Sequence, residues 1–178
     1  MMKRLMMSAL LGAALTFTAS AQSAKNGFST GPVFEAFGPT AQVESDQAIP
    51  EGTEFKVVFD IAEASEDDVL NKRFESVARF INMHARAGIP LEDIKPAIVV
   101  HGGAATHLTK PAEDAEASDT TKLVEALIAN GVPIYLCGQT AAARGITKED
   151  LLPGVQMSLS AMTAHALLAR DGYTLNPF

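Results

Sequence analysis

The chain has 178 residues, a formal net charge of −7 and a single cysteine. This length suits one domain that can build an apolar core without disulfides, and one cysteine cannot form a disulfide within its own chain. The acidic charge and the lack of a basic cluster argue against binding to nucleic acid or to an anionic membrane surface.

Residues 1–21 are predicted to be a secretory signal peptide. Lys3 and Arg4 form a positive start, residues 5–17 are almost entirely apolar, and Ala19-Ser20-Ala21 supplies the small-x-small pattern that precedes a cleavage site. The apolar run is shorter than the roughly 20 residues of a membrane span. We therefore expect cleavage after Ala21, a periplasmic location and no membrane attachment afterwards. An uncleaved N-terminal anchor is the alternative.

The remaining chain divides into two parts. Residues 22–53 are rich in Gly, Pro, Ser and polar residues, and are predicted to form an extended N-terminal arm that packs irregularly, with at most a short strand. Residues 54–178 are predicted to form one α/β domain. Removal of Lys3 and Arg4 with the signal peptide would change the formal net charge from −7 to −9.

Strands and helices are predicted to alternate along this domain. Strands are expected over residues 55–61, 97–100, 133–137 and 155–159, with a last short one at 173–175. Helices are expected over residues 69–87, about 120–129, from Gly138 onward, and over 161–170. The expected caps are Asp67 or Asp68 for the first helix, Asp119 or Thr120 for the second and Ser160 for the last. This alternation predicts βαβ units and a mainly parallel sheet that is covered on both faces.

Two residues with reactive side chains are predicted to lie at the carboxyl ends of strands, where sites in such sheets form. Cys137 ends a strand where a helix begins, and the unpaired N–H groups of a first helical turn favour a thiolate, which is the nucleophile. His101 could polarise or deprotonate a group near Cys137. The alternatives are a small buried apolar cysteine and a histidine bonded to a nearby loop carbonyl.

Other polar signals are weaker. His101 and His107 lack further ligands at a suitable spacing, so no metal is expected, and the Gly102-Gly103 turn lacks the remaining residues of a phosphate loop. His84 and His165 fall within helical patterns and are expected to be packing or surface residues. No cofactor is expected.

Several segments together resemble a known family. They are Val99-Val100-His101-Gly102, residues 131–140 with Leu136-Cys137-Gly138-Gln139-Thr140, Leu151-Leu152-Pro153-Gly154-Val155, Gly172-Tyr173 and residues 77–82. These segments resemble the DsrE/DsrF-like (YchN-like) family, and most of all its exported branch with a single cysteine. The likeness covers roughly residues 54–176.

The resemblance implies a flavodoxin-like three-layer sandwich and a homo-oligomer, either a trimer or a hexamer. It also implies that Cys137 carries a persulfide. His101 is the second candidate catalytic residue, from its place at the end of a strand. Gly102, Gly103, Gly138, Gln139 and Thr140 are expected to contact the ligand. Because the chain has one cysteine, a second thiol would come from a sulfur-donor or sulfur-acceptor protein. The alternative functions are a small-ligand-binding module and an oligomeric structural protein without chemistry.

Overall fold

The sheet is entirely parallel. The computed structural model describes residues 27–66 and 69–176, so the predicted signal peptide and the predicted caps Asp67 and Asp68 lie outside the described residues. The strands are β1 (Phe55–Ile61), β2 (Ile94–Val100), β3 (Ile134–Cys137), β4 (Val155–Ser158) and β5 (Thr174–Asn176). They form one sheet in the order β4-β3-β2-β1-β5, and all four neighbouring pairs are parallel.

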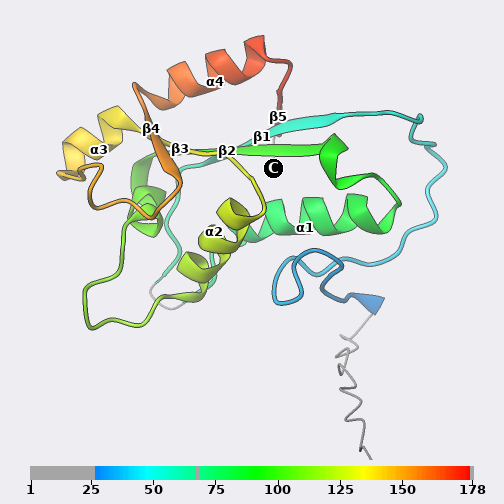
Figure 1. Ribbon diagram of the computed structural model, residues 1–178, viewed down its shortest axis with the longest axis horizontal. Helices are drawn as coiled ribbons and strands as arrows, with labels where there is room; N and C mark the ends of the chain where they lie inside the picture. The colour runs from blue at the N-terminus through cyan, green and yellow to red at the C-terminus, as the bar shows by residue number, and fades with distance from the viewer. Residues whose placement is uncertain (1–26, 67–68, 177–178) are drawn as a thin grey trace, which may run out of the picture.

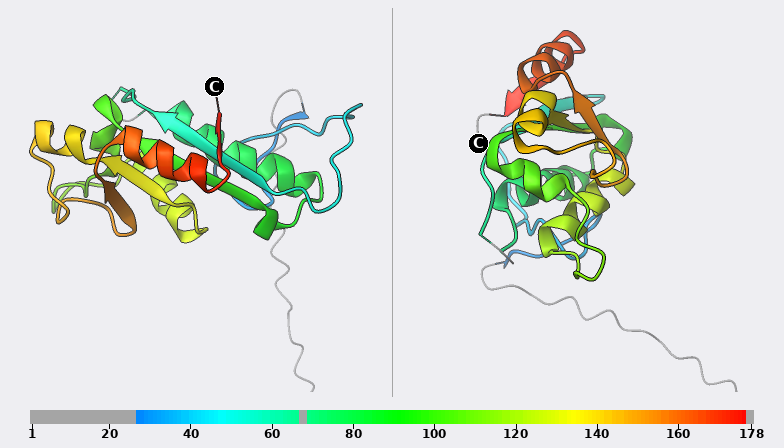
Figure 2. Two further views of the ribbon diagram at one scale, coloured as in Figure 1. Left: turned by 90° about the horizontal axis from the view of Figure 1, so that it is seen from above. Right: turned by 90° about the vertical axis from the view of Figure 1, so that its left-hand side faces the viewer.

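Helices cover both faces of this sheet. They are α1 (Lys72–Arg86), α2 (Asp119–Ala129), α3 (Gly138–Arg144) and α4 (Ala161–Arg170), with short 3₁₀ helices η2 (Leu91–Asp93) and η3 (Gly102–Leu108). Figure 1 shows α1 and α2 on one face and α4 on the other, and α3 lies toward the carboxyl ends of the strands (Figure 2). The predicted flavodoxin-like three-layer α/β fold is confirmed. Across the described ranges, no helix is both long and apolar enough to cross a membrane.

Strand alternation separates two apolar clusters. In β1, Phe59 and Ile61 face the larger core under α1 and α2, whereas Val58 belongs to a smaller cluster with Leu168 of α4. Successive side chains of a strand point to opposite faces, so Asp60 shares the α4 face with Val58. The α4 face therefore carries a carboxylate near the end of β1.

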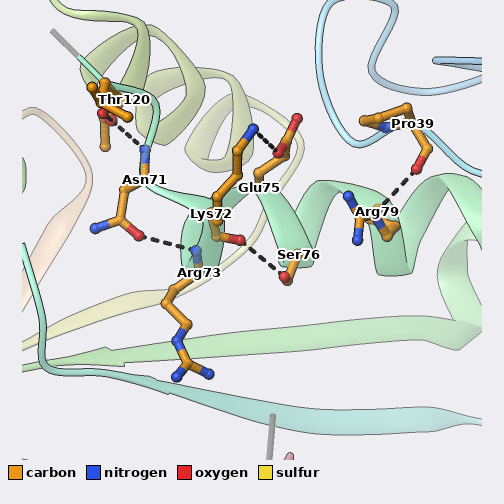
Figure 3. Close-up of polar contacts among 9 residues, drawn as sticks. Pro39, Asn71, Lys72, Arg73, Glu75, Ser76, Arg79 and Thr120 are labelled. Carbon is orange, nitrogen blue, oxygen red and sulfur yellow. Dashed lines mark hydrogen bonds and ion pairs between the residues drawn. The ribbon is translucent and has the colours of Figure 1, made fainter. Parts of the chain in front are cut away.

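Helix α1 begins at Lys72, three residues after the predicted start. The Asn71 backbone is extended, its side chain accepts a hydrogen bond from the Arg73 N–H at 3.0 Å, and its own N–H donates to the Thr120 hydroxyl at 2.9 Å (Figure 3). An asparagine in this position satisfies a helix N–H that has no partner within the helix. The contact with Thr120 also joins the starts of α1 and α2.

Strand β2 begins at Ile94, three residues before the prediction, and it contains Pro96. The Ile98 N–H donates toward β3, to the Pro133 carbonyl at 2.9 Å, so the imide nitrogen of Pro96 faces the same side. Strand β3 pairs with β2 only from Ile98 onward. The N–H that proline lacks therefore has no strand opposite it, which is why proline is tolerated here.

Two smaller predictions are corrected. The cap of α2 is Ser118, whose hydroxyl accepts from the Thr121 N–H at 3.1 Å, rather than Asp119 or Thr120. The Gly102-Gly103 turn continues as η3 through Leu108. The predicted cap Ser160 is confirmed, because its hydroxyl accepts from the Thr163 N–H at 3.0 Å.

The described part of the N-terminal arm folds back onto α1. Asn82, which is fully buried, accepts hydrogen bonds from the N–H groups of Val33 and Phe34 and donates to the carbonyls of Phe34, Phe37 and Gly38, all within 3.1 Å. One side chain thus satisfies the backbone of a loop that precedes it by more than 40 residues. These hydrogen bonds of Asn82 attach the arm to the face of α1 that points away from the sheet (Figure 1).

Candidate functional site

A pocket of about 330 Å³ lies at the carboxyl edge of the sheet. Its lining comprises Asp60, His101, Cys137, Gln139, Thr140, Ser160, Ala161, Met162 and His165. The pocket lies at the carboxyl ends of β1, β2 and β3 and beside the start of α4. Sites in open parallel sheets form outside the carboxyl ends of the strands.

Cys137 is the last residue of β3 and the N-cap residue of α3. It is only 6 % exposed, and it lines the pocket. Four hydrogen-bond donors surround its sulfur: the backbone N–H groups of Thr140, Ala161 and Gln139 and the Thr140 hydroxyl. Burial raises the pKa of the Cys137 thiol, but these hydrogen bonds outweigh burial and hold the pKa below its usual value. The starts of two helices, α3 and α4, therefore favour the thiolate together.

Thr140 connects this sulfur to η3. Its hydroxyl oxygen accepts a hydrogen bond from the Gly102 N–H at 3.2 Å. The same hydroxyl can still donate its single proton to the Cys137 sulfur, because the bond from Gly102 uses only a lone pair of its oxygen. Gln139 turns the other way and donates to the Leu159 carbonyl at 3.2 Å. Both residues line the pocket, one beside the thiol and the other toward the loop between β4 and α4.

The three predicted glycines have packing roles that are visible in the structure. A Cβ on Gly138 would lie 2.6 Å from the Ser158 carbonyl oxygen, and a Cβ on Gly102 would lie 2.8 Å from the Ala62 carbonyl oxygen. At Gly103 a Cβ would come within 3.2 Å of the Ala64 nitrogen. These glycines let neighbouring loops approach closely. They stand beside the pocket, whose lining is supplied by their neighbours His101, Gln139 and Thr140.

A carboxylate joins two histidines across the pocket from the thiol. Asp60 accepts from the His101 Nε2 at 3.1 Å through one oxygen and from the His165 Nε2 at 2.7 Å through the other. Burial raises the pKa of Asp60, but the hydrogen bonds from His165 and His101 and their charges lower it further than burial raises it. Asp60 therefore remains a carboxylate at neutral pH.

Sequence reasoning missed Asp60 and treated His165 as a packing or surface residue. Asp60 is a charged residue near the carboxyl end of a mostly apolar strand, and the two-residue period of a strand would have placed it on the face opposite Phe59. The sequence alone could therefore have marked Asp60 as a candidate site residue. No comparable signal marks His165, because its place above β1 depends on how α4 crosses the sheet.

His107 lies elsewhere. Its Nε2 accepts from the Ser65 N–H at 3.1 Å, and burial lowers the pKa of its imidazole. His101 and His107 thus have different partners and are not brought together. Within residues 27–66 and 69–176, no group of three or more His, Cys, Asp or Glu side chains is arranged to hold a metal ion.

A second pocket, of about 380 Å³, lies at the opposite edge of the sheet between the arm and the amino ends of β2 and β3. Val33, Lys95 and Tyr173 contribute to its lining. Although it is slightly larger, it contains no thiol and no bridged pair of titratable groups. The chemistry of the described residues is concentrated at the carboxyl edge.

The chain is similar to two solved structures, and the first of them shares its fold. The protein of unknown function MTH1491 from Methanobacterium thermoautotrophicum is 24 % identical with a TM-score of 0.54, over 69 % of this chain and 98 % of that one. The ychN protein from E. coli is 22 % identical with a TM-score of 0.49, over 68 % and 99 % of the two chains. No curated protein matches the sequence. Residues 56–177 match the DsrE/DsrF-like family, and the chain therefore belongs to the DsrE/DsrF-like family.

Proposed function

We propose that this protein is an exported sulfur carrier that holds a persulfide on Cys137. The observation that supports the proposal most directly is the set of four hydrogen-bond donors around the Cys137 sulfur, which favour the thiolate at the wall of an open pocket. The thiolate is the form of cysteine that attacks another sulfur atom.

The chemistry requires no oxidant beyond the sulfur donor. The Cys137 thiolate attacks the outer sulfur of a persulfide R–S–SH, a new S–S bond forms, the old S–S bond breaks, and R–S⁻ leaves. The products are Cys137–S–SH and the donor thiolate, so atoms and electrons balance. Since the chain has one cysteine, both the donor and the acceptor thiol belong to other molecules.

The test is the intact mass of the mature protein after exposure to inorganic polysulfide. We expect an increase of about 32 Da, the mass of one sulfur atom, that a reducing thiol reverses. Cys137→Ser should show no increase, and because serine is nearly the same size it should fold like the wild type. A native protein that takes up no sulfur, although its thiol reacts after unfolding, would contradict the carrier function and favour a small-ligand-binding module.

Export is a separate part of the proposal and rests on the sequence of residues 1–21. Mature protein recovered from the periplasm should begin at Gln22, because Ala19-Ser20-Ala21 ends there. N-terminal sequencing measures this directly. Protein that retains Met1 or Met2 in the membrane fraction would contradict cleavage.

We also propose assembly into a homo-oligomer, as a trimer or a hexamer. Support comes from large apolar side chains that are exposed on or beside α4, Leu159 at 72 % and Met162 at 79 %. The α1 side is already covered by the arm, which leaves the α4 side free for a second copy. Light scattering should show a multiple of the monomer mass that falls to one monomer in Met162→Glu. A wild-type monomer at micromolar concentration would contradict assembly.

A further inference from the structure

We propose that His101 and His165, positioned by Asp60, exchange protons with the thiols that meet Cys137. This inference deepens the proposed function and rests on it. It names the substrate class as neutral thiols, which must lose a proton before they can attack the bound sulfur. It also gives roles to Asp60 and His165, which the sequence did not single out.

The geometry orients both imidazoles. Asp60 holds one carboxylate oxygen 3.1 Å from the His101 Nε2 and the other 2.7 Å from the His165 Nε2. An ionised carboxylate only accepts hydrogen bonds, so each Nε2 carries the proton. Each Nδ1 is then the nitrogen that can take up a proton from a ligand.

Three elements must meet to build this arrangement. Asp60 comes from β1, His101 from the end of β2 and His165 from α4, and all three line the same pocket as Cys137. The titratable groups that line this pocket, one from each surrounding element, are these three and the thiol on β3. About a third of the His101 side chain and a quarter of the His165 side chain are exposed, so a ligand in the pocket can reach them.

The fold does not require a charge at this position. The neighbours of Asp60 in β1 are Phe59 and Ile61, which are buried in the larger core, and Val58 precedes it on the same face within the smaller apolar cluster. An apolar residue would continue that cluster. A carboxylate that both histidines contact is instead what a site for proton transfer needs, because it fixes the ring orientation and stabilises the imidazolium.

Proton exchange serves both directions of transfer. During release, an acceptor R–SH gives its proton to an imidazole, R–S⁻ attacks the outer sulfur of Cys137–S–SH, and Cys137 leaves as a thiolate that its four hydrogen-bond donors stabilise. During loading, the departing R–S⁻ takes the proton back. Each S–S bond that breaks is matched by one that forms, and no net oxidation occurs.

The experiment follows the pH dependence of sulfur release. Full mature protein is loaded with inorganic polysulfide, checked by mass, and mixed with N-acetylcysteine between pH 6 and 9. Without a base, the rate follows the fraction of thiolate and rises about tenfold per pH unit below the thiol pKa. We expect wild type to show a much flatter dependence. Asp60→Asn and the double variant His101→Gln with His165→Gln should follow the tenfold slope and be about tenfold or more slower than wild type near pH 6.5.

Two controls separate proton exchange from structural damage. In the histidine variants, the glutamine keeps an N–H donor near the former Nε2 position but cannot take up a proton. Glu54→Gln is the control variant. It removes one negative charge at the amino end of β1, away from the pocket, so it should behave like wild type. An aromatic thiol that is already ionised at pH 7 needs no base, so it should remove sulfur from wild type and variants at equal rates.

The possible results are distinct. If variants and wild type share one pH slope, or if the variants slow both thiols equally, the proton-exchange role is wrong while the carrier function stands. If Cys137 takes up no sulfur, both proposals fail. A flat wild-type profile that steepens in Asp60→Asn, with the aromatic thiol unaffected, supports the inference.

Discussion

The two faces of the sheet differ in what they bury. Under α1 and α2 the face is apolar along its length, with Phe59, Phe74 and Leu123 in one large cluster. Under α4 a small apolar cluster, which includes Leu168, gives way to Asp60 and His165 toward the carboxyl edge. Figure 2 shows the corresponding asymmetry, with α4 alone across one face.

Because of this difference, neighbouring residues of one strand serve different purposes, one for stability and the next for chemistry. Phe59 and Asp60 are adjacent in β1, yet one is buried in the main core and the other lines the pocket. Because hydrophobic stabilisation grows with the apolar area removed from water, the α1 face should supply most of the stability. The α4 face can then carry titratable groups at little cost to folding.

The largest expected effect compares one substitution on each face. Leu123→Ala empties part of the main core and should lower the free energy of unfolding by about 4 kcal/mol, whereas Leu168→Ala in the smaller cluster should cost about 2 kcal/mol. Leu123 is fully buried in the large cluster, whereas Leu168 is 6 % exposed and belongs to the smaller cluster, so the second site can relax more easily. Urea denaturation measures both. Equal losses of unfolding free energy in the two variants would contradict the expected difference in stability between the faces.

The arm extends the comparison to the outer side of α1. Asn82→Ala removes every hydrogen bond by which this side chain holds the arm, and it should cost about 2–3 kcal/mol because buried N–H and C=O groups lose their partner. Limited proteolysis should then cut within residues 27–53. Asn130→Ala is the control, since its exposed amide contacts only the Ala126 carbonyl. An arm that stays resistant in Asn82→Ala would show that the apolar contacts of Phe34 hold it.

A smaller effect is expected from charge on the α4 face. The hydrogen bonds from His165 and His101 outweigh burial and lower the pKa of Asp60 below its usual 3.8. A carboxyl with a lowered pKa stabilises the fold above its unfolded-state pKa, and this contribution is lost as pH falls through its folded-state pKa. Asp60→Asn should thus be destabilised by at most about 0.5 kcal/mol at pH 7, because solvent screens a partly exposed pair.

The pH series sharpens that prediction. The difference between wild type and Asp60→Asn should be constant near neutral pH and disappear below pH 3.8, the usual pKa of the side chain. Thermal denaturation across this range measures it. A difference that instead grows as the solution becomes more acidic would contradict the assigned direction of the Asp60 pKa.

The smallest expected effect concerns the thiol. The hydrogen bonds from Thr140, Ala161 and Gln139 outweigh burial and lower the pKa of Cys137, so its alkylation should show a midpoint below that of a free cysteine. Thr140→Val removes one donor and should shift the midpoint upward. It also removes the acceptor of the Gly102 N–H, so circular dichroism must show that the variant is folded. Thr109→Val is the matched control outside the pocket. An unchanged midpoint in Thr140→Val would assign the lowered pKa to backbone N–H groups alone.

The sequence was sufficient for the fold class and for part of the site. Alternating apolar strands and amphipathic helices predicted a parallel sheet covered on both faces, and Ser160 was readable as a cap. Because parallel strands end at one edge, the positions of His101 and Cys137 in the sequence were enough to place both at that edge. The strand order then decides that β2 and β3 are neighbours. Each of these conclusions depends on local pattern or on a property that all parallel sheets share.

Only the tertiary structure decided the rest of the site. His165 contacts Asp60 across 105 residues of sequence, and the Ala161 N–H reaches the Cys137 sulfur, because α4 crosses the sheet from β4 to β5 on the face opposite α1 and α2. The period of a strand shows that Asp60 and Phe59 face opposite sides, but it does not show which helix lies over each side. That choice depends on the strand order and on the packing of the whole domain, since many orders satisfy the same local pattern.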